Sequence, residues 1–124
     1  YQHVLEPLGA YLMIVKEQYE RPELAGAYNV GPDDRDCITT GELADLFCGA
    51  WKNGAAWENL YAGGPHEANF LKLDCSRIKN IFGWKPHWQV KDAVEKSVEW
   101  YQAWIDGQDM VKLTDEQIET YYHC

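Results

Sequence analysis

The sequence lacks a loop of the kind that holds the phosphates of a dinucleotide. Its 124 residues contain no GxGxxG or GxxGxxG spacing, and the only adjacent glycines are Gly63 and Gly64. A catalytic Tyr and Lys of the dehydrogenase kind stand four residues apart on one helical face, and no tyrosine here has a lysine four positions later. We therefore assign no catalytic residue and expect no cofactor to bind to this chain itself.

Metal and nucleophile motifs are also missing. No pair of cysteines has CxxC spacing, no two histidines stand at helical metal-pair spacing, and no nucleophile elbow occurs. A Ser–His–Asp arrangement assembled by the fold stays open, with no motif to support it. The sequence therefore predicts no metal site and gives little support to a hydrolase.

Positive charge and long apolar runs are scarce as well. There are 20 acidic against 11 basic residues, a formal net charge of −9, which disfavours nucleic acid and anionic membranes as partners. No run approaches the length of a membrane-spanning helix, and no signal-peptide pattern occurs. With four cysteines that need not pair, we expect a cytoplasmic protein. The first residue is Tyr1 rather than Met, and we interpret the chain as a fragment of a longer protein.

Helical periodicity dominates what is present, within a length that fits one domain, residues 1–124. Apolar spacing, capping residues and glycine stops predict helices over 6–20, 39–50, 76–82 and 90–106, and a last helix that begins near Thr114. Short strands are expected at 27–30, 56–62 and 69–73. The expected fold class is α/β, mostly helices with a few short strands. That is too little strand for a complete doubly wound sheet.

The first predicted helix is apolar nearly all round from Tyr11 to Val15. Such a helix expects cover on more than one side. We expect an uncovered apolar face, through which the chain would self-associate.

Four segments taken together resemble the carboxyl-terminal half of extended short-chain dehydrogenases that act on nucleotide sugars, the NAD-dependent epimerase and dehydratase family. They are QHVLEP at 2–7, AYNVGP at 27–32, HEANFLKLDCSRIKNIFGWKP at 66–86 and EWYQAW at 99–104. The Asp-x-Ser-Arg and Gly-Trp-x-Pro pairs are the most specific to the superfamily. The HEA triplet, QHVLEPL and the tail QIETYY narrow the resemblance to the dehydratases, with CDP-glucose as the implied substrate.

The resemblance implies a lyase reaction for a longer parent protein. An amino-terminal Rossmann half would bind NAD and carry the catalytic pair. The cofactor would oxidise C4 of the glucosyl unit, water would leave across C5 and C6, and hydride would return to C6. The parent would be a homo-oligomer that supplies deoxysugar for surface polysaccharide. This chain would form the sugar-nucleotide-binding wall of the cleft and would be inactive alone.

The resemblance also implies substrate-binding positions. Tyr1 matches an aromatic that follows a diphosphate-binding arginine in the family, an arginine absent from this chain. Glu67 falls near the ribose hydroxyls, with His66 beside it as a phosphate donor; from composition alone, the loop that holds both is more simply a polar turn. Pro32, Asp33 and Asp34 border the base or ribose. Two alternatives stay open: another nucleotide-sugar epimerase or dehydratase, and a stand-alone binding module without an enzymatic parent.

Overall fold

The computed structural model describes residues 1–60 and 72–123, and within them the chain forms helices joined by irregular segments. The α-helices are α1 (Leu5–Glu20), α2 (Thr40–Trp51), α3 (Ser76–Phe82), α4 (Val90–Ile105) and α5 (Met110–Tyr122). Two 3-10 turns, η1 (Pro22–Leu24) and η2 (Asp34–Asp36), follow α1 and precede α2. The helical character predicted from the sequence is confirmed.

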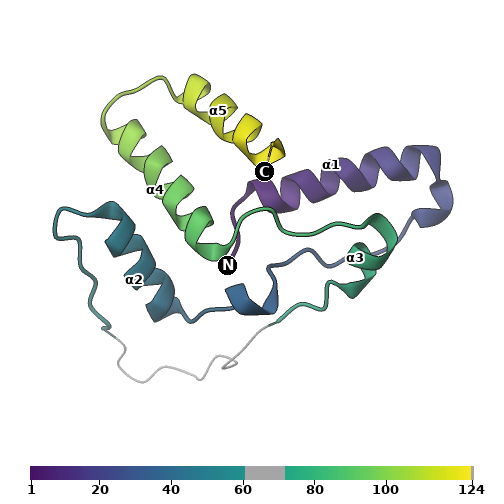
Figure 1. Cartoon of the computed structure of the whole chain (residues 1–124), viewed down its shortest axis with the longest axis horizontal. Coiled ribbons are helices and arrows are strands. Elements are labelled where there is room, and N and C mark those ends of the chain that lie inside the picture. The colour runs from purple at the N-terminus through teal and green to yellow at the C-terminus, as the bar shows by residue number, and fades with distance from the viewer. Residues whose placement is uncertain (61–71, 124) are drawn as a thin grey trace.

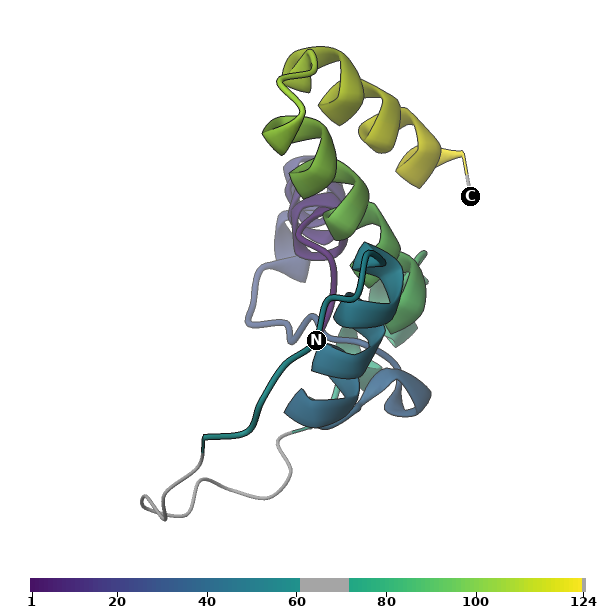
Figure 2. The ribbon, with the colours of Figure 1, turned by 90° about the vertical axis from the view of Figure 1, so that its left-hand side faces the viewer.

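The helices form an open arrangement around the amino end of α4. Helices α2 and α4 lie side by side, α5 folds back along α4, and α1 projects away from their junction (Figure 1). The view turned by 90° shows the same pairing of α2 with α4, with α5 above them (Figure 2). Helix α3 lies beneath α1, on the segment that leads to α4.

The predicted helix boundaries are confirmed for the first four helices. The Thr39 hydroxyl accepts the Glu42 amide at 3.2 Å, and the Glu42 carboxylate accepts the Thr39 amide at 2.7 Å, which completes the capping box of α2. Gly83 ends α3 in the left-handed conformation, with φ of 65°. This conformation costs glycine little, because it has no Cβ.

The structure corrects the prediction of short strands for the residues that it describes. Within residues 1–60 and 72–123, the segment 27–30 is irregular and pairs with no strand: the carbonyls of Val30 and Ala27 accept bonds from the side chains of Gln2 and Arg77. Because a strand is defined by a neighbouring ladder, such a segment without a partner is not one. Residues 56–60 and 72–73 are also irregular, and the remainder of those two predicted strands lies outside the described residues.

The start of the last helix is a second correction: α5 begins at Met110, four residues before Thr114. The Asp109 carboxylate accepts the amides of Val111 and Lys112, each at 3.1 Å, and therefore caps the helix there. The Thr114 hydroxyl lies inside the helix and contacts the Trp100 indole N–H at 3.1 Å. The Thr114 spacing resembled a capping box by coincidence.

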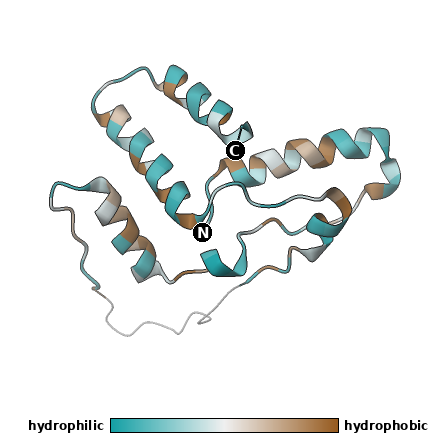
Figure 3. Ribbon diagram, viewed as in Figure 1, coloured by the Kyte–Doolittle hydropathy of each residue, from teal (hydrophilic) through white to brown (hydrophobic). Residues whose placement is uncertain are grey.

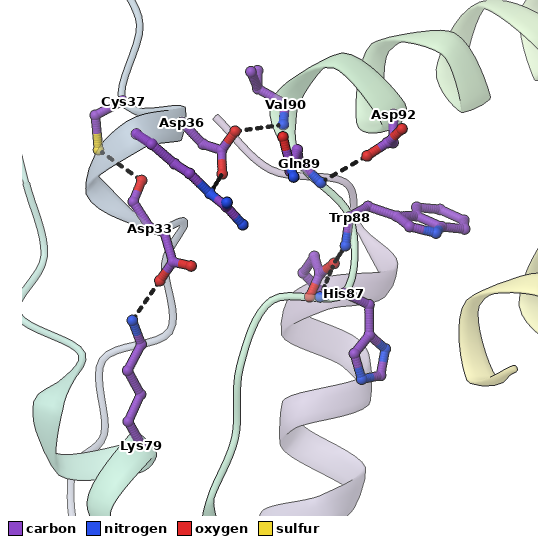
Figure 4. A network of polar contacts seen from close by, with 11 residues as sticks. Asp33, Asp36, Cys37, Lys79, His87, Trp88, Gln89, Val90 and Asp92 are labelled. Atoms are coloured by element: carbon purple, nitrogen blue, oxygen red, sulfur yellow. Dashed lines mark hydrogen bonds and ion pairs between the residues drawn. The ribbon is translucent and has the colours of Figure 1, made fainter. Parts of the chain in front are cut away.

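Three carboxylates converge on the amides that open α4. Glu6 accepts the amides of His87 at 3.0 Å and Trp88 at 2.7 Å. Asp92 accepts the Gln89 amide at 3.1 Å, and Asp36 accepts the Val90 amide at 3.1 Å (Figure 4). Four successive N–H groups of the chain are thus satisfied by carboxylates, as the positive end of a helix dipole favours.

Glu6 is fully buried and also joins α5 to this junction. Its second oxygen accepts the Tyr121 hydroxyl at 3.1 Å, and the Tyr121 ring contacts those of Trp88 and His87. A Cβ added at Gly9 would lie 3.0 Å from the Tyr121 ring, so glycine there lets α1 and α5 approach closely. The buried carboxyl group is tolerated because three donors surround it.

A second cluster packs α1 on α3. Ile78 and Ala10 are fully buried at its centre, with Cys75 and Trp84 nearly so. Tyr28 and Phe82 pack edge to face at its margin, 5.1 Å between centroids. This contact leaves the other side of α1 in solvent.

Much of the apolar surface is uncovered. In the described residues, seventeen large hydrophobic side chains are exposed, against ten apolar side chains in the core. Five of the seventeen form a stripe on α1, which we call the α1 face: Leu8, Tyr11, Leu12, Val15 and Tyr19. Figure 3 shows the apolar middle of this helix. None of the described helices has both the length and the hydropathy needed to cross a membrane.

Truncation of Glu6 tests whether its bonds at the amino end of α4 stabilise the fold. In Glu6→Ala, the buried amide of Trp88 and the partly buried amide of His87 lose their acceptor, and we expect the free energy of unfolding to fall by about 3 kcal/mol. Tyr121→Phe removes one bond of the same carboxylate and costs about 1 kcal/mol. Urea unfolding measures both. The exposed Glu20→Ala on the same helix is the control, and equal stability of the two alanine variants would contradict this role of Glu6.

The surroundings of His3 predict that the stability of the folded chain depends on pH. Its Nδ1 accepts the Leu5 amide at 3.3 Å and its ring packs on Trp88, so protonation of Nδ1 breaks the bond at the start of α1. Burial first, and then nearby Lys96, lower the pKa of His3 in the folded state. The unfolded chain then binds the proton more tightly, and stability falls as the pH drops from about 7 to 5. His3→Phe should flatten this slope in urea titrations, whereas His123→Gln should leave it unchanged.

Candidate functional site

The loop before α2 is fixed by Asp36, which is 5% exposed. Its carboxylate accepts the Val90 amide and lies 3.7 Å from the Arg35 guanidinium. The Cys37 thiol donates to the Asp33 carbonyl at 3.7 Å, which closes the turn η2. The side chains of Asp33 and Asp34 are therefore carried on a turn tied to the amino end of α4. Figure 4 shows Asp33 on this turn.

A second wall, residues 72–79, faces this loop. Lys79 on α3 forms an ion pair with Asp33, and this hydrogen bond raises the pKa of Lys79. Lys72 lies 3.3 Å from the Asp34 carboxylate. Because these groups are one-third or more exposed, the pairs fix geometry more than they add stability.

The turn that begins α3 completes this wall. The Asp74 carboxylate accepts the Ser76 amide at 2.9 Å, and hydrogen bonds from the Ser76 hydroxyl and amide lower the pKa of Asp74. The buried Cys75 thiol contacts the Gly31 carbonyl at 3.9 Å, and its pKa is raised chiefly by burial. A thiol with a raised pKa is a weak nucleophile at neutral pH. Cys75 is therefore a packing residue of this wall.

Between the loop and the wall lies a cavity of about 720 Å³, which we call the loop pocket. Three cations and three carboxylates line it together with Pro32, Leu73, Cys75 and Ser76; the charged residues are Arg35, Lys72, Lys79, Asp33, Asp34 and Asp74. Alternating donors and acceptors suit a polar ligand that carries both hydroxyl groups and negative charge. Figure 4 shows the Asp33–Lys79 pair at its edge.

Arg77, from the Asp-x-Ser-Arg segment, holds the two sides of the site together. Its guanidinium donates to the Ala27 carbonyl at 3.2 Å and lies 4.7 Å from the centroid of the Tyr28 ring. The Asn29 amide donates to the Asp74 carbonyl at 3.0 Å in the same region. Arg77 therefore positions the loop pocket without lining it, and Asn29 ties the segment before the loop to the turn that begins α3.

The structure places only some of the predicted site residues in the loop pocket. Pro32, Asp33 and Asp34 line the loop pocket, as a contiguous loop would. The Tyr1 hydroxyl lies 2.7 Å from the Thr40 hydroxyl at the start of α2, and Tyr1 does not line that pocket. His66 and Glu67 lie outside the described residues.

Sequence reasoning missed the cations of the loop pocket, Arg35, Lys72 and Lys79. Lys79 is 46 positions from its partner Asp33, so no local spacing announces the pair. Arg35 alone adjoined a predicted site residue. In residues 1–60 and 72–123, no three His, Cys, Asp or Glu side chains gather closely enough to hold a metal ion.

Comparison with known proteins gives one informative match. No protein-family model matches the chain. Over 122 residues, 98% of its length, it is 36% identical to an enzyme of Salmonella typhimurium strain LT2. The chain is similar to CDP-glucose 4,6-dehydratase. It spans only 34% of that dehydratase, about a third of its length. The resemblance read from the sequence segments is thereby confirmed.

Proposed function

We propose that this chain is the carboxyl-terminal, substrate-binding part of a CDP-glucose 4,6-dehydratase, with residues 1–124 as one sugar-nucleotide-binding domain. Similarity to the Salmonella dehydratase along 98% of the chain is the observation that carries the proposal. The parent would convert CDP-glucose to CDP-4-dehydro-6-deoxyglucose with loss of water. Its place in deoxysugar synthesis for surface polysaccharide belongs to the same proposal.

The division of labour follows from what the chain carries. NAD, bound by the other part of the parent, would supply the reversible hydride transfer. No Tyr–Lys pair at four-residue spacing occurs in the sequence, so proton transfer is also assigned to that part. The residues of this chain would bind and orient the nucleotide, and the chain alone would be inactive. Turnover of CDP-glucose by this chain with added NAD would contradict the assignment.

The loop pocket supports a nucleotide-diphosphate ligand. Lys72 and Lys79 can exchange their present carboxylate partners for phosphate oxygens, and the Asp33 and Asp34 carboxylates can accept ribose hydroxyls. His66 and Glu67 lie outside the described residues, and the Tyr1 hydroxyl contacts Thr40 at the start of α2, so these three positions are proposed on the resemblance alone. The substrate-binding residues proposed are thus Tyr1, Pro32, Asp33, Asp34, His66 and Glu67, with Lys72 and Lys79 added.

The α1 face supports the proposal that another part of the parent protein packs against this chain. Leu12 and Val15 are 65% and 66% exposed, and Tyr19 is 89% exposed. Isolated apolar side chains at a surface are ordinary, but five at helical spacing form a patch that usually marks an interface. We propose that the nucleotide-binding part of the parent covers this face. We also propose that the parent is a homo-oligomer.

Nucleotide titration tests the substrate assignment. By calorimetry, CDP should bind more tightly than UDP or dTDP, and Lys79→Ala should weaken CDP roughly tenfold because a charge-assisted phosphate contact is lost. Lys112→Ala, on the outer side of α5, is the matched control and should leave affinity unchanged. Equal or reversed affinities among the three nucleotides would reject CDP-glucose and favour another nucleotide-sugar epimerase or dehydratase.

Exposure of the α1 face predicts the behaviour of this chain in solution. It should self-associate and bind a hydrophobic dye, because a large apolar patch is open to solvent. Leu12→Glu combined with Val15→Glu should abolish both, as measured by sedimentation and dye fluorescence. Val111→Glu changes an apolar residue on α5 that is at least as exposed and is the control. A clean monomer without dye binding would contradict the proposed interface.

A further inference from the structure

Two ion pairs cross the loop pocket from one wall to the other. Asp33, on the loop, pairs with Lys79 of α3 (Figure 4), and its neighbour Asp34 pairs with Lys72 at 3.3 Å. All four side chains line the pocket. The two lysines that the proposed function assigns to phosphate oxygens are therefore already paired with anions, and these anions belong to the chain itself.

The Asp33 carboxylate is not what holds its own turn together. Its side chain caps no amide of η2. The turn is closed through the backbone instead, because the Asp33 carbonyl accepts the Asp36 amide at 2.9 Å and the Cys37 thiol at 3.7 Å. In the part of the chain that the structure describes, the carboxylate thus contacts Lys79 rather than the turn that carries it.

The Asp33–Lys79 pair is one that a more highly charged anion displaces. The two side chains are 33% and 38% exposed, and a pair between such groups contributes little to stability. The hydrogen bond with Asp33 raises the pKa of Lys79, so the ammonium group is fully charged at neutral pH. A diphosphate carries more negative charge than one carboxylate and attracts this ammonium group more strongly.

We propose that Asp33 and Asp34 form an autoinhibitory contact, which we call the carboxylate latch, that competes with the phosphates of the ligand for Lys79 and Lys72. The inference rests on the proposed function, because it takes a nucleotide diphosphate as the ligand of the loop pocket. The diphosphate binds by replacing both carboxylates at the two ammonium groups, and no covalent bond changes. The displaced carboxylates then lie beside the ligand, where the proposed function gives them ribose hydroxyls.

The carboxylate latch makes the two roles of Asp33 separable by the sign of a mutational effect. Asp33→Asn removes the charge that competes for Lys79, so an anion without a ribose should bind more tightly. If Asp33 only accepted ligand hydroxyls, the same variant would leave such an anion unaffected. The substitution should not disturb the turn, because the Asp33 side chain caps no amide there.

Asp74 supplies the matched control, because it lines the same pocket without holding a lysine. Its carboxylate accepts the Ser76 amide at 2.9 Å, and it forms no ion pair within the described residues. Asparagine caps such a turn about as well as aspartate does, so Asp74→Asn should fold. It removes one negative charge from the cavity, as Asp33→Asn does, but frees no ammonium group. Circular dichroism checks the fold of both variants.

The probe is inorganic pyrophosphate, which has the charge of a diphosphate and no ribose, titrated with the chain and followed by phosphorus NMR. Asp33→Asn should tighten its binding about threefold, the scale set by a partly exposed ion pair. Asp74→Asn should change the affinity less than about twofold. Lys79→Ala should weaken binding roughly tenfold and thereby locates the pyrophosphate in the loop pocket.

The outcomes separate the carboxylate latch from the function on which it rests. Unchanged or weaker binding to Asp33→Asn would overturn the latch, and so would equal tightening by Asp33→Asn and Asp74→Asn, because pocket charge alone would then explain the effect. In either case, weakening by Lys79→Ala leaves the proposed function standing. An affinity that Lys79→Ala does not change, or no binding at all, would overturn both, because phosphates would then not contact this pocket.

Discussion

The structure depends on the satisfaction of four successive backbone amides, those of residues 87–90, by the carboxylates of Glu6, Asp92 and Asp36. Each carboxylate comes from a different element: α1, α4 itself and the turn before α2. The amino end of α4 therefore fixes the relative placement of three segments that are far apart in the sequence. Tyr121 adds α5 through the same buried Glu6. An open array of helices with a small core needs such a polar junction to have a defined geometry.

The same junction positions the loop pocket. Asp36 accepts the Val90 amide and thereby fixes the turn that carries Asp33 and Asp34 into this pocket. The pocket mixes cations with carboxylates, and two of its lysines pair with the acids of the turn. The α1 face differs from it because its exposed side chains are apolar.

Local signals predicted the helices well and the long-range contacts poorly. Thr39, Gly83 and Gly107 mark helix ends through backbone chemistry that acts within a few residues, so spacing alone revealed them. Thr114 misled because its hydroxyl is used by Trp100 from another helix. The segment 27–30 has strand-like residues, yet a strand requires a partner that periodicity cannot supply. Pro32, Asp33 and Asp34 were reached through family resemblance. Lys72 and Lys79 were missed because only the fold brings them to the loop, and the role of Glu6 was missed because an acid in the first turn of a helix is ordinary.

The most direct measurement of the central claim, that this chain supplies one wall of a nucleotide-sugar cleft, is an amide chemical-shift map recorded while CDP is added. The account predicts shifts concentrated in two segments, 31–35 and 72–79, with the amides of α5 unaffected. Shifts confined to α5, or a spectrum unchanged at saturating CDP, would contradict it.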